Sequence, residues 1–194
     1  MQLFGKKKHL NTREKQGPEA FSMEALKKCS EGDGRAQKAL YDALSAKMFA
    51  VCLRYMGDRS EAEDIFQDGF VTLFSKLDSY SGDGSFEGWA RKIFVNTALM
   101  ALRKKDVLRQ SEDVEAARSL ASDAETPIQK MSSNELNRMI AELPPGFRTV
   151  FNMYVVEGYS HKEIAEALGI SETTSRSQLQ RARTMLQNRI KDKY

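Results

Sequence analysis

The sequence has few of the residues that build disulfide frameworks or metal sites, with two cysteines and two histidines among 194 residues. Cys29 and Cys52 fall in expected helices, lack a paired framework and follow no signal peptide. We therefore expect them to be small core residues of a reduced, cytoplasmic protein. His9 and His161 have no cysteine or carboxylate neighbours at metal-ligand spacing. The sequence predicts no disulfide, no metal and no other cofactor.

Long apolar runs are also missing. Apolar residues make up 41% of the chain and charged residues 29%, and no uninterrupted apolar stretch is long enough to span a bilayer. These proportions are typical of soluble, helix-rich domains, so we expect no direct insertion into a membrane. The net charge of +3 is too small for indiscriminate coating of nucleic acid. Any contact with DNA must come from local patches.

The alternation typical of strands is nearly absent, and apolar residues recur at helical spacing, which predicts an all-α protein. Four helices are expected in the first part of the chain, at about 18–29, 35–56, 60–80 and 86–105. Gly32-Asp33-Gly34 separates the first two. Ser60 and Glu63 have the spacing of a capping box at the start of the third. Together these helices form a first domain at 18–105, after a basic N-terminal extension at 1–17.

The composition of the chain changes at 106–127. This segment contains six acidic residues and two arginines, and it has no aromatic residue. Such a composition favours a flexible acidic linker. A second domain is expected at 128–194. Ser132 and Glu135 have capping-box spacing at its first helix, which ends at Pro144-Pro145 before another helix at 147–156. The predicted fold therefore consists of two small helical domains joined by this linker.

The run from Ser160 to Leu186 has the pattern of a helix-turn-helix. Ser160 and Glu163 have capping-box spacing, Gly169 permits a left-handed turn, and Ser171 can cap the second helix. The inward stripe of that helix consists of Ser175, Leu179, Ala182 and Leu186. Its outward face carries Thr173, Thr174, Ser177, Gln180, Arg181 and Thr184, flanked by Arg176 and Arg183. Such donors meet base edges and phosphates when a helix lies in the major groove. The alternative is a solvated face on a helical hairpin.

Several segments, taken in order, resemble a bacterial RNA polymerase sigma factor of the extracytoplasmic-function (ECF) type. These are AEDIFQDGFVTLF (62–74), FEGWARKIFVNTALMALRKK (86–105), LPPGFRTVF (143–151), YSHKEIAEALGIS (159–171) and RSQLQRAR (176–183). The resemblance covers about 20–191 and implies a sigma domain two, the linker, and a sigma domain four. It also implies that core RNA polymerase and promoter DNA are partners. The resemblance further implies an anti-sigma factor as a partner, which in this family is often anchored in a membrane.

One face of the helix expected at 60–80 carries Glu61, Asp64, Gln67, Asp68 and Val71. The resemblance assigns Asp64, Gln67 and Asp68 on this face to docking on the coiled coil of the polymerase clamp. The alternative is a solvated acidic helix start, which the helix dipole favours.

The resemblance assigns the loop at 79–85 and the helix after it to recognition and melting of the minus-ten element. The implied DNA-contacting residues are Asp83, Ser85, Arg91, Lys92, Asn96, Arg103 and Lys104. Opening a promoter requires a pocket for an unstacked base and a cationic track for the unpaired strand. Asn96 has an alternative role as a core or capping amide. Trp89 is expected to be a core residue rather than a stacking platform.

In the last helix the resemblance implies recognition of the minus-thirty-five element. The residues implied are Thr173, Thr174, Arg176, Ser177, Gln180 and Arg181. Ser175 stands where an aliphatic residue is common in the family, and we expect it to weaken the packing of this helix or to let it shift. Gln178 stands where a basic residue is common, which removes a phosphate contact.

The function expected from these features is promoter-specific transcription initiation as a sigma factor, with a free-standing helix-turn-helix regulator as the alternative. A regulator does not need the 86–105 helix or the acidic face. An enzyme would rest on Ser160 and His161 beside Glu163, but adjacent helical residues do not face each other, and capping already accounts for Ser160 and Glu163. We therefore expect no catalysis by this chain.

Overall fold

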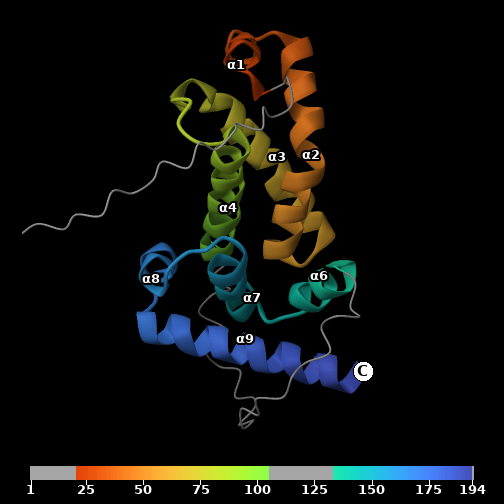
Figure 1. Ribbon diagram of the computed structural model, residues 1–194, viewed down its shortest axis with the longest axis vertical. Helices are drawn as coiled ribbons and strands as arrows, with labels where there is room; N and C mark the ends of the chain where they lie inside the picture. Colours follow the sequence, from red (N-terminus) through yellow and green to blue (C-terminus); the bar gives the residue numbers. More distant parts are fainter. Residues whose placement is uncertain (1–20, 105–132, 194) are drawn as a thin grey trace, which may run out of the picture.

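The computed structural model describes residues 21–104 and 133–193. The expected N-terminal extension at 1–17 and the linker at 106–127 lie outside these ranges, as do Lys105 and Ser132. Within the described ranges the structure is helical without strands, which confirms the all-α fold class (Figure 1). None of these helices is both long and apolar enough to cross a membrane.

The first half of the structure is a bundle of four α-helices. In chain order these are α1 (Met23–Ser30), α2 (Gly34–Met56), α3 (Arg59–Ser75) and α4 (Phe86–Lys104), with the short 3₁₀-helix η2 (Leu77–Ser79) after α3. The Asp33 carboxylate accepts hydrogen bonds from the backbone N–H groups of Arg35 and Ala36 and so begins α2. Gly57, with φ 74°, ends α2 in the left-handed conformation.

Two helices of this bundle begin at residues other than those that the sequence predicts. The N-cap of α3 is Asp58, whose carboxylate accepts from the Glu61 N–H at 3.0 Å, so the expected Ser60 cap is wrong. Asp58 adds a negative charge at the positive end of the helix, whereas the Ser60 hydroxyl has none. The first helix begins at Met23 after a Ser22 cap instead of near Pro18.

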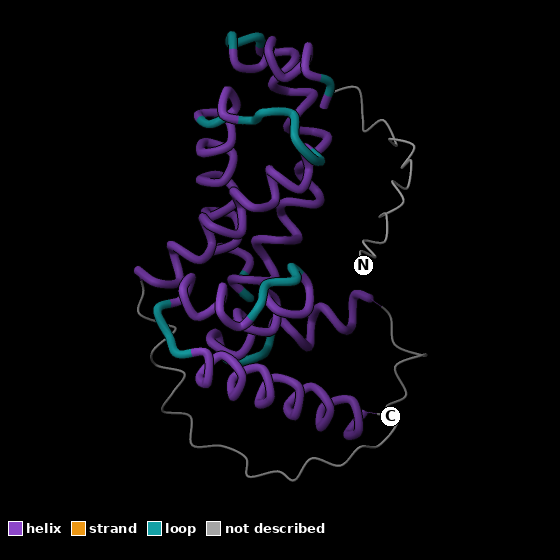
Figure 2. The backbone as a smooth tube through the Cα atoms, turned by 60° about the vertical axis from the view of Figure 1, so that its left-hand side comes forward, coloured by secondary structure: helices purple, strands orange, loops and turns teal. Residues whose placement is uncertain are grey.

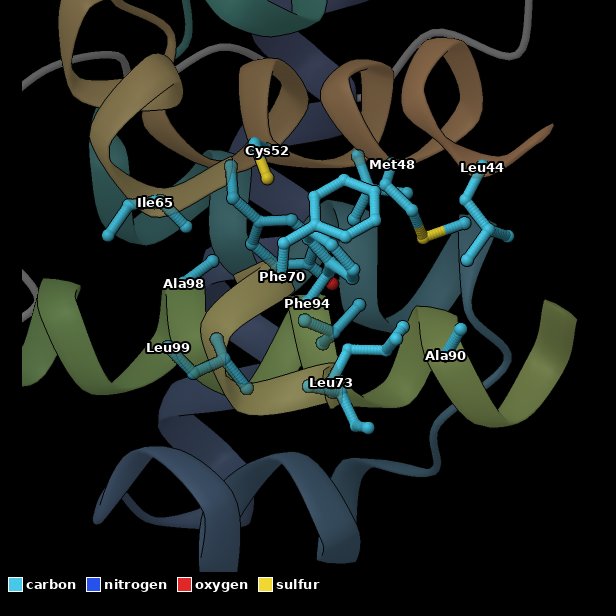
Figure 3. Packing of buried hydrophobic residues seen from close by; sticks show 14 of the residues in the cluster. Leu44, Met48, Cys52, Ile65, Phe70, Leu73, Ala90, Phe94, Ala98 and Leu99 are labelled. Carbon is cyan, nitrogen blue, oxygen red and sulfur yellow. The ribbon is translucent and has the colours of Figure 1, made fainter. Parts of the chain in front are cut away.

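The core of this bundle is formed by α2, α3 and α4 (Figure 3). Its labelled members are Leu44, Met48 and Cys52 of α2, Ile65, Phe70 and Leu73 of α3, and Ala90, Phe94, Ala98 and Leu99 of α4. Phe94 is fully buried and lies edge-on to Phe70, with ring centroids 5.2 Å apart. Cys29 and Cys52 are buried, as predicted, and both are free thiols. Burial raises the pKa of the Cys52 thiol to about 12.

The second half consists of shorter helices lying on one long helix (Figure 2). These are α6 (Ser133–Ala141), α7 (Pro145–Phe151), the π-helix η4 (Asn152–Val156), α8 (His161–Leu168) and α9 (Glu172–Lys193). The expected helix at 147–156 therefore begins two residues earlier, at Pro145, and its second part is π-helical. Proline suits the first helical turn because an N–H group at this position would have no partner within the helix.

The two halves are packed against each other, a contact that the sequence does not indicate. One buried apolar cluster includes residues of α2, α3 and α4 together with five residues of the second half, namely Val150, Met153, Ile164, Leu168 and Leu179. A second, smaller cluster joins α6 and α7 to α9. Figure 1 shows α6 and α7 beside the C-terminal end of α2, with α9 crossing beneath them.

Polar groups of the second half complete the C-terminal end of α2. The last four carbonyls of a helix have no partner within it. Here the Leu53 carbonyl accepts a hydrogen bond from the Gly57 N–H. The Arg54 carbonyl accepts one from the side-chain amide of Asn152 at 2.9 Å. The carbonyls of the last two residues of α2, Tyr55 and Met56, accept from the Arg148 guanidinium at 3.0 and 2.6 Å. Each of the four carbonyls therefore has a donor.

The crossing of α3 and α4 depends on Gly69, because a Cβ added there would lie 2.4 Å from two Phe94 ring carbons. We predict that Gly69→Ala lowers the free energy of unfolding by about 1–2 kcal/mol, since overpacking typically costs more than the roughly 1 kcal/mol of helix propensity that alanine adds. Urea denaturation measures this change. The control is Gly34→Ala, where no atom lies within 4 Å. Equal stability of both variants would contradict the packing at Gly69.

Candidate nucleic-acid interface

Helices α8 and α9 form the helix-turn-helix that the sequence predicts. The Ser160 Oγ accepts from the Glu163 N–H at 3.3 Å, and the Glu163 carboxylate accepts from the Ser160 N–H at 2.8 Å. These bonds lower the pKa of the Glu163 carboxyl. Gly169 adopts φ 68°, and the Ser171 Oγ accepts from the Thr174 N–H at 2.9 Å. The capping box, the turn glycine and the second cap are thus confirmed.

The outward face of α9 is accessible along its first three turns. Thr173, Arg176, Ser177, Gln180 and Arg181 are exposed. Thr174 is half-buried and its hydroxyl is bonded to Ser171. Arg176 pairs with Glu172 at 2.7 Å in a solvent-exposed ion pair, which is a weak interaction that a phosphate or base edge can replace. The Arg181 guanidinium lies over the Phe147 ring at 5.9 Å, so its stem also covers an apolar rim.

The inner face of α9 corrects two expectations. Ser175 is fully buried, and its hydroxyl is bonded to His161 Nδ1 at 2.9 Å. This hydrogen bond joins α8 to α9, so the serine contributes a specific contact where the sequence suggested only weaker packing. Gln178 is buried as well, at 4% exposure. It therefore lies on the inner side of the helix, and its position is not one from which a basic side chain would reach a phosphate.

The loop between η2 and α4 is held in shape by its own polar groups. The Tyr80 hydroxyl donates to the Gly84 carbonyl at 2.8 Å, and the Ser81 hydroxyl donates to the Asp83 carboxylate at 2.9 Å. The Ser85 Oγ accepts from the Gly88 N–H at 2.9 Å and so begins α4. Asp83 and Ser85 are both exposed. The structure therefore presents this loop to solvent next to the first turn of α4.

An aromatic cluster packs beside the loop and includes its residue Tyr80. Trp89 is half-buried, and its ring centroid lies 5.4 Å from those of Tyr80 and Phe86. Phe21 also packs against Phe86, with ring centroids 5.4 Å apart. Trp89 thus belongs to the packing of this region, in agreement with the structural role expected from the sequence.

The polar face of α4 carries most of the residues expected to contact the minus-ten element. Lys92, Asn96, Arg103 and Lys104 are exposed. Lys92, Asn96 and Arg103 recur at intervals of four and seven residues, which places them on one face of the helix. The exposure of Asn96 excludes the alternative role of a core amide. Arg91 differs from the others, because it is partly buried and lies 3.6 Å from the Glu157 carboxylate of the second half.

The acidic face of α3 is accessible where the sequence predicts it. Asp64, Gln67 and Asp68 are exposed, and Val71 beside them is 71% exposed. Glu61 belongs to a different environment. It is half-buried, and its negative charge acts on Arg148, where it opposes the lowering of the arginine pKa by burial. The exposed acidic face of α3 therefore consists of Asp64, Gln67, Asp68 and Val71.

Comparison with known proteins gives the family. A model of sigma-70 region 2 matches residues 40–107, and a model of sigma-70 region 4 matches residues 133–186. The ECF RNA polymerase sigma-E factor of Haemophilus influenzae is 28% identical over 176 residues, covering 85% of this chain and 93% of that protein. The ECF RNA polymerase sigma factor SigW of Bacillus subtilis is 27% identical over 180 residues, covering 86% and 95%.

A solved structure of the sigma factor RpoE in complex with the anti-sigma factor NepR from Bartonella quintana matches 79% of this chain and 96% of that one, at 22% identity and a TM-score of 0.48. Two helical units that match regions 2 and 4 in this order define a transcription initiation factor of the sigma-70 class. The chain belongs to the sigma-70 family of RNA polymerase sigma factors, and within it to the ECF group.

The His161 contact predicts a pH dependence of stability. Burial, followed by the charge of Arg176, lowers the pKa of His161 below its ordinary value of 6.5, while Glu172 opposes and Arg183 adds to this shift. The unfolded chain therefore binds a proton at a higher pH than the folded chain does, and stability falls as the pH drops through 6.5 towards the folded pKa.

We expect the melting temperature of the wild type to decrease between pH 7.5 and pH 5.5 more than that of His161→Gln. Thermal unfolding followed by circular dichroism measures both. The variant shares every other titrating group, so an identical pH dependence would show that His161 does not contribute.

Proposed function

We propose that this chain directs promoter-specific initiation by core RNA polymerase, with the first half recognising the minus-ten element and the second half the minus-thirty-five element. The observation that carries the proposal is the presence in one chain of a region 4 helix-turn-helix with a free polar face and a region 2 bundle with an exposed cationic helix. Each surface contacts DNA without help from a cofactor, since side-chain donors and cations suffice.

The proposed minus-thirty-five surface is the exposed face of α9. A recognition helix reads bases with residues of its N-terminal turns, and Thr173, Arg176 and Ser177 occupy those turns. Gln180 and Arg181 follow one turn later on the same side. Thr174 contributes to the cap of the helix, and its backbone N–H is already bonded to Ser171. The main candidates for base contacts are therefore Arg176 and Gln180.

The proposed minus-ten surface combines the 80–85 loop with α4. Opening the duplex costs a few kcal/mol per unstacked base, so the open strand needs contacts that the duplex lacks. Lys92, Arg103 and Lys104 form a cationic track along α4 for the phosphates. Asn96 lies within this track and offers a donor and an acceptor for a base edge. Asp83 and Ser85 stand at the adjacent loop.

The acidic face of α3 is proposed as the polymerase-docking surface, with an apolar contact at Val71. An exposed face on which carboxylates adjoin an apolar residue suits a partner that carries cations around an apolar centre. By this proposal the chain adds promoter specificity and strand separation to the active site of the polymerase and catalyses nothing itself. It acts in the cytoplasm, and a protein that covers these surfaces acts as its anti-sigma factor.

Run-off transcription with core polymerase tests the function. The wild type is expected to start transcripts at specific genomic sites that core polymerase alone does not use. Asp64→Arg combined with Asp68→Arg should weaken polymerase binding more than about tenfold, because it reverses two charges on the docking face. It should leave the melting temperature unchanged, since both side chains are exposed.

The matched control is Glu31→Arg with Asp42→Arg, which reverses two exposed charges outside the proposed docking face. Undiminished polymerase binding by the α3 variant would refute the docking surface. Tight, sequence-specific binding of duplex DNA by the free wild-type protein would favour the regulator instead.

The two arginines of α9 are expected to differ in effect. Arg176→Ala should relax selectivity at one position of the minus-thirty-five element, because a bidentate contact with guanine discriminates by about 1–3 kcal/mol. Arg181→Ala should lower activity evenly across promoter variants, as the loss of a phosphate contact does. Transcription from a library randomised at this element separates these effects, and a melting curve of each variant shows any loss of packing on Phe147. If both variants keep the promoter selectivity of the wild type, α9 does not lie in the major groove of the minus-thirty-five element.

A further inference from the structure

The exposed face of α4 carries one large apolar side chain, that of Met100. The exposed residues of this helix are Gly88, Lys92, Asn96, Met100, Arg103 and Lys104. The other large apolar side chains of α4 are buried or half-buried in the bundle. Met100 is instead 68% exposed. Its environment therefore differs from that of every other large apolar residue in this helix.

Met100 lies in the same row of side chains as three of the proposed DNA contacts. Lys92, Asn96, Met100 and Lys104 follow one another at intervals of four residues, and residues four apart lie on the same face of a helix. A helical side chain leans over the turn that precedes it, so the thioether of Met100 extends toward Asn96. Arg103 and Lys104 follow on its other side. Met100 is thus flanked by a proposed base-contacting amide and by proposed phosphate-binding cations.

A single exposed methionine is common on protein surfaces and needs no explanation by itself. Met100 differs from that case in two respects. Its neighbours in the row, Asn96 and Lys104, are polar, and the other exposed large apolar side chains of the described residues lie on other helices, so Met100 is not the margin of an apolar patch. It also lies on the face along which the open strand is proposed to bind. Bound DNA would therefore cover this side chain.

An apolar side chain that DNA covers is stabilised where it meets an apolar group of the DNA. On the base edges of the major groove that group is the 5-methyl group of thymine. Methionine suits such a contact, because its side chain is flexible and its thioether is polarizable. Cytosine presents an amino group to the groove instead, which an apolar side chain would leave without a hydrogen-bond partner.

The spacing along α4 allows Asn96 and Met100 to face the edges of nearby bases. Four residues of an α-helix rise by about 6 Å, and successive base pairs of B-DNA are about 3.4 Å apart. If the amide of Asn96 faces the edge of one base, the side chain of Met100 faces an edge about two base pairs away. The phosphates there are within the part of α4 that carries Arg103 and Lys104.

We propose that Met100 contacts the methyl group of a thymine about two base pairs from the base that Asn96 contacts, and thereby adds a preference for thymine to the minus-ten element. This contact rests on the function proposed above, in which α4 faces that element. Arg103 and Lys104 bind phosphates of any sequence and so contribute affinity, whereas Met100 distinguishes one base from another. Burial of one methyl group changes an equilibrium about fourfold.

Run-off transcription with core polymerase and the full-length protein tests the contact. Templates randomised at the minus-ten element show which bases the wild type prefers, and a preference for thymine is expected at one position. Thymine at that position is then replaced by uracil, on one strand at a time. This replacement removes only the methyl group. It should lower initiation by the wild type about three- to fivefold when it is made on the contacted strand.

Two substitutions of Met100 separate the methyl contact from other roles. Met100→Gln keeps the length and the helix propensity of the side chain but ends in a polar amide. This variant should initiate equally from the thymine and uracil templates. Met100→Leu stays apolar and should keep a preference for thymine. The matched control is Met23→Gln, the same change at a 57% exposed methionine on α1, and it should respond to uracil as the wild type does.

Melting curves verify that each variant is folded, which is expected because both methionines are exposed. An equal response to uracil in the wild type and in Met100→Gln would overturn the thymine contact. If Met100→Gln lowers initiation by the same factor on every template, the side chain acts as a wedge between bases or as a packing residue, and the thymine contact is overturned as well. Failure of the proposed function looks different, because the wild type would then start no specific transcript from any template.

Discussion

The last turn of α2 ends in carbonyls that need donors from outside the helix, and the position of the second half depends on how they are supplied. Gly57 provides one donor, and Asn152 and Arg148 provide the others from more than ninety residues further along the chain. Because hydrogen bonds require both distance and direction, these donors orient α7 on the first half. Helix α7 in turn packs on α9. The direction in which the recognition helix points is therefore tied to the end of a helix in the other half.

Polar groups inside the second half are bonded to one another, whereas the polar face of α9 stays exposed to solvent. Inside the second half, Ser175 is bonded to His161, and the carbonyls of Ala141 and Leu143 are bonded to Arg148. On the outside, Arg176 is paired with the exposed carboxylate of Glu172 one turn away. A buried polar group that lost its partner would cost far more than an exposed ion pair that exchanges one anion for another. Binding of DNA to α9, as proposed, would therefore leave the internal contacts of the helix-turn-helix intact.

Local features of the chain were predictable from sequence, and contacts between distant segments were not. The Ser160 capping box, the Gly169 turn and the exposed acidic face of α3 depend on residues three or four positions apart, a spacing that a helix converts directly into contact. Asp58 and Ser60 both have cap-forming side chains, and only the path of the preceding loop decides between them. Ser175 and Gln178 are both buried, and Ser175 is bonded to His161 of α8, a contact between residues fourteen positions apart. The burial of Arg148 could not be foreseen, since its acceptors lie in another helix and an arginine in LPPGFRTVF suggests a surface residue.

The composition of the contact between the halves determines how specific and how stable this contact is. A purely apolar interface would gain stability in proportion to its area and would offer a partner little to exchange. Here the apolar contribution of Val150, Met153 and Ile164 is combined with carbonyls, arginines and a carboxylate that water can solvate after separation. The polar groups make the packed arrangement specific, because a shifted register would leave Arg148 buried without acceptors. They also limit its net stability, since each hydrogen bond lost on opening is replaced by one to water.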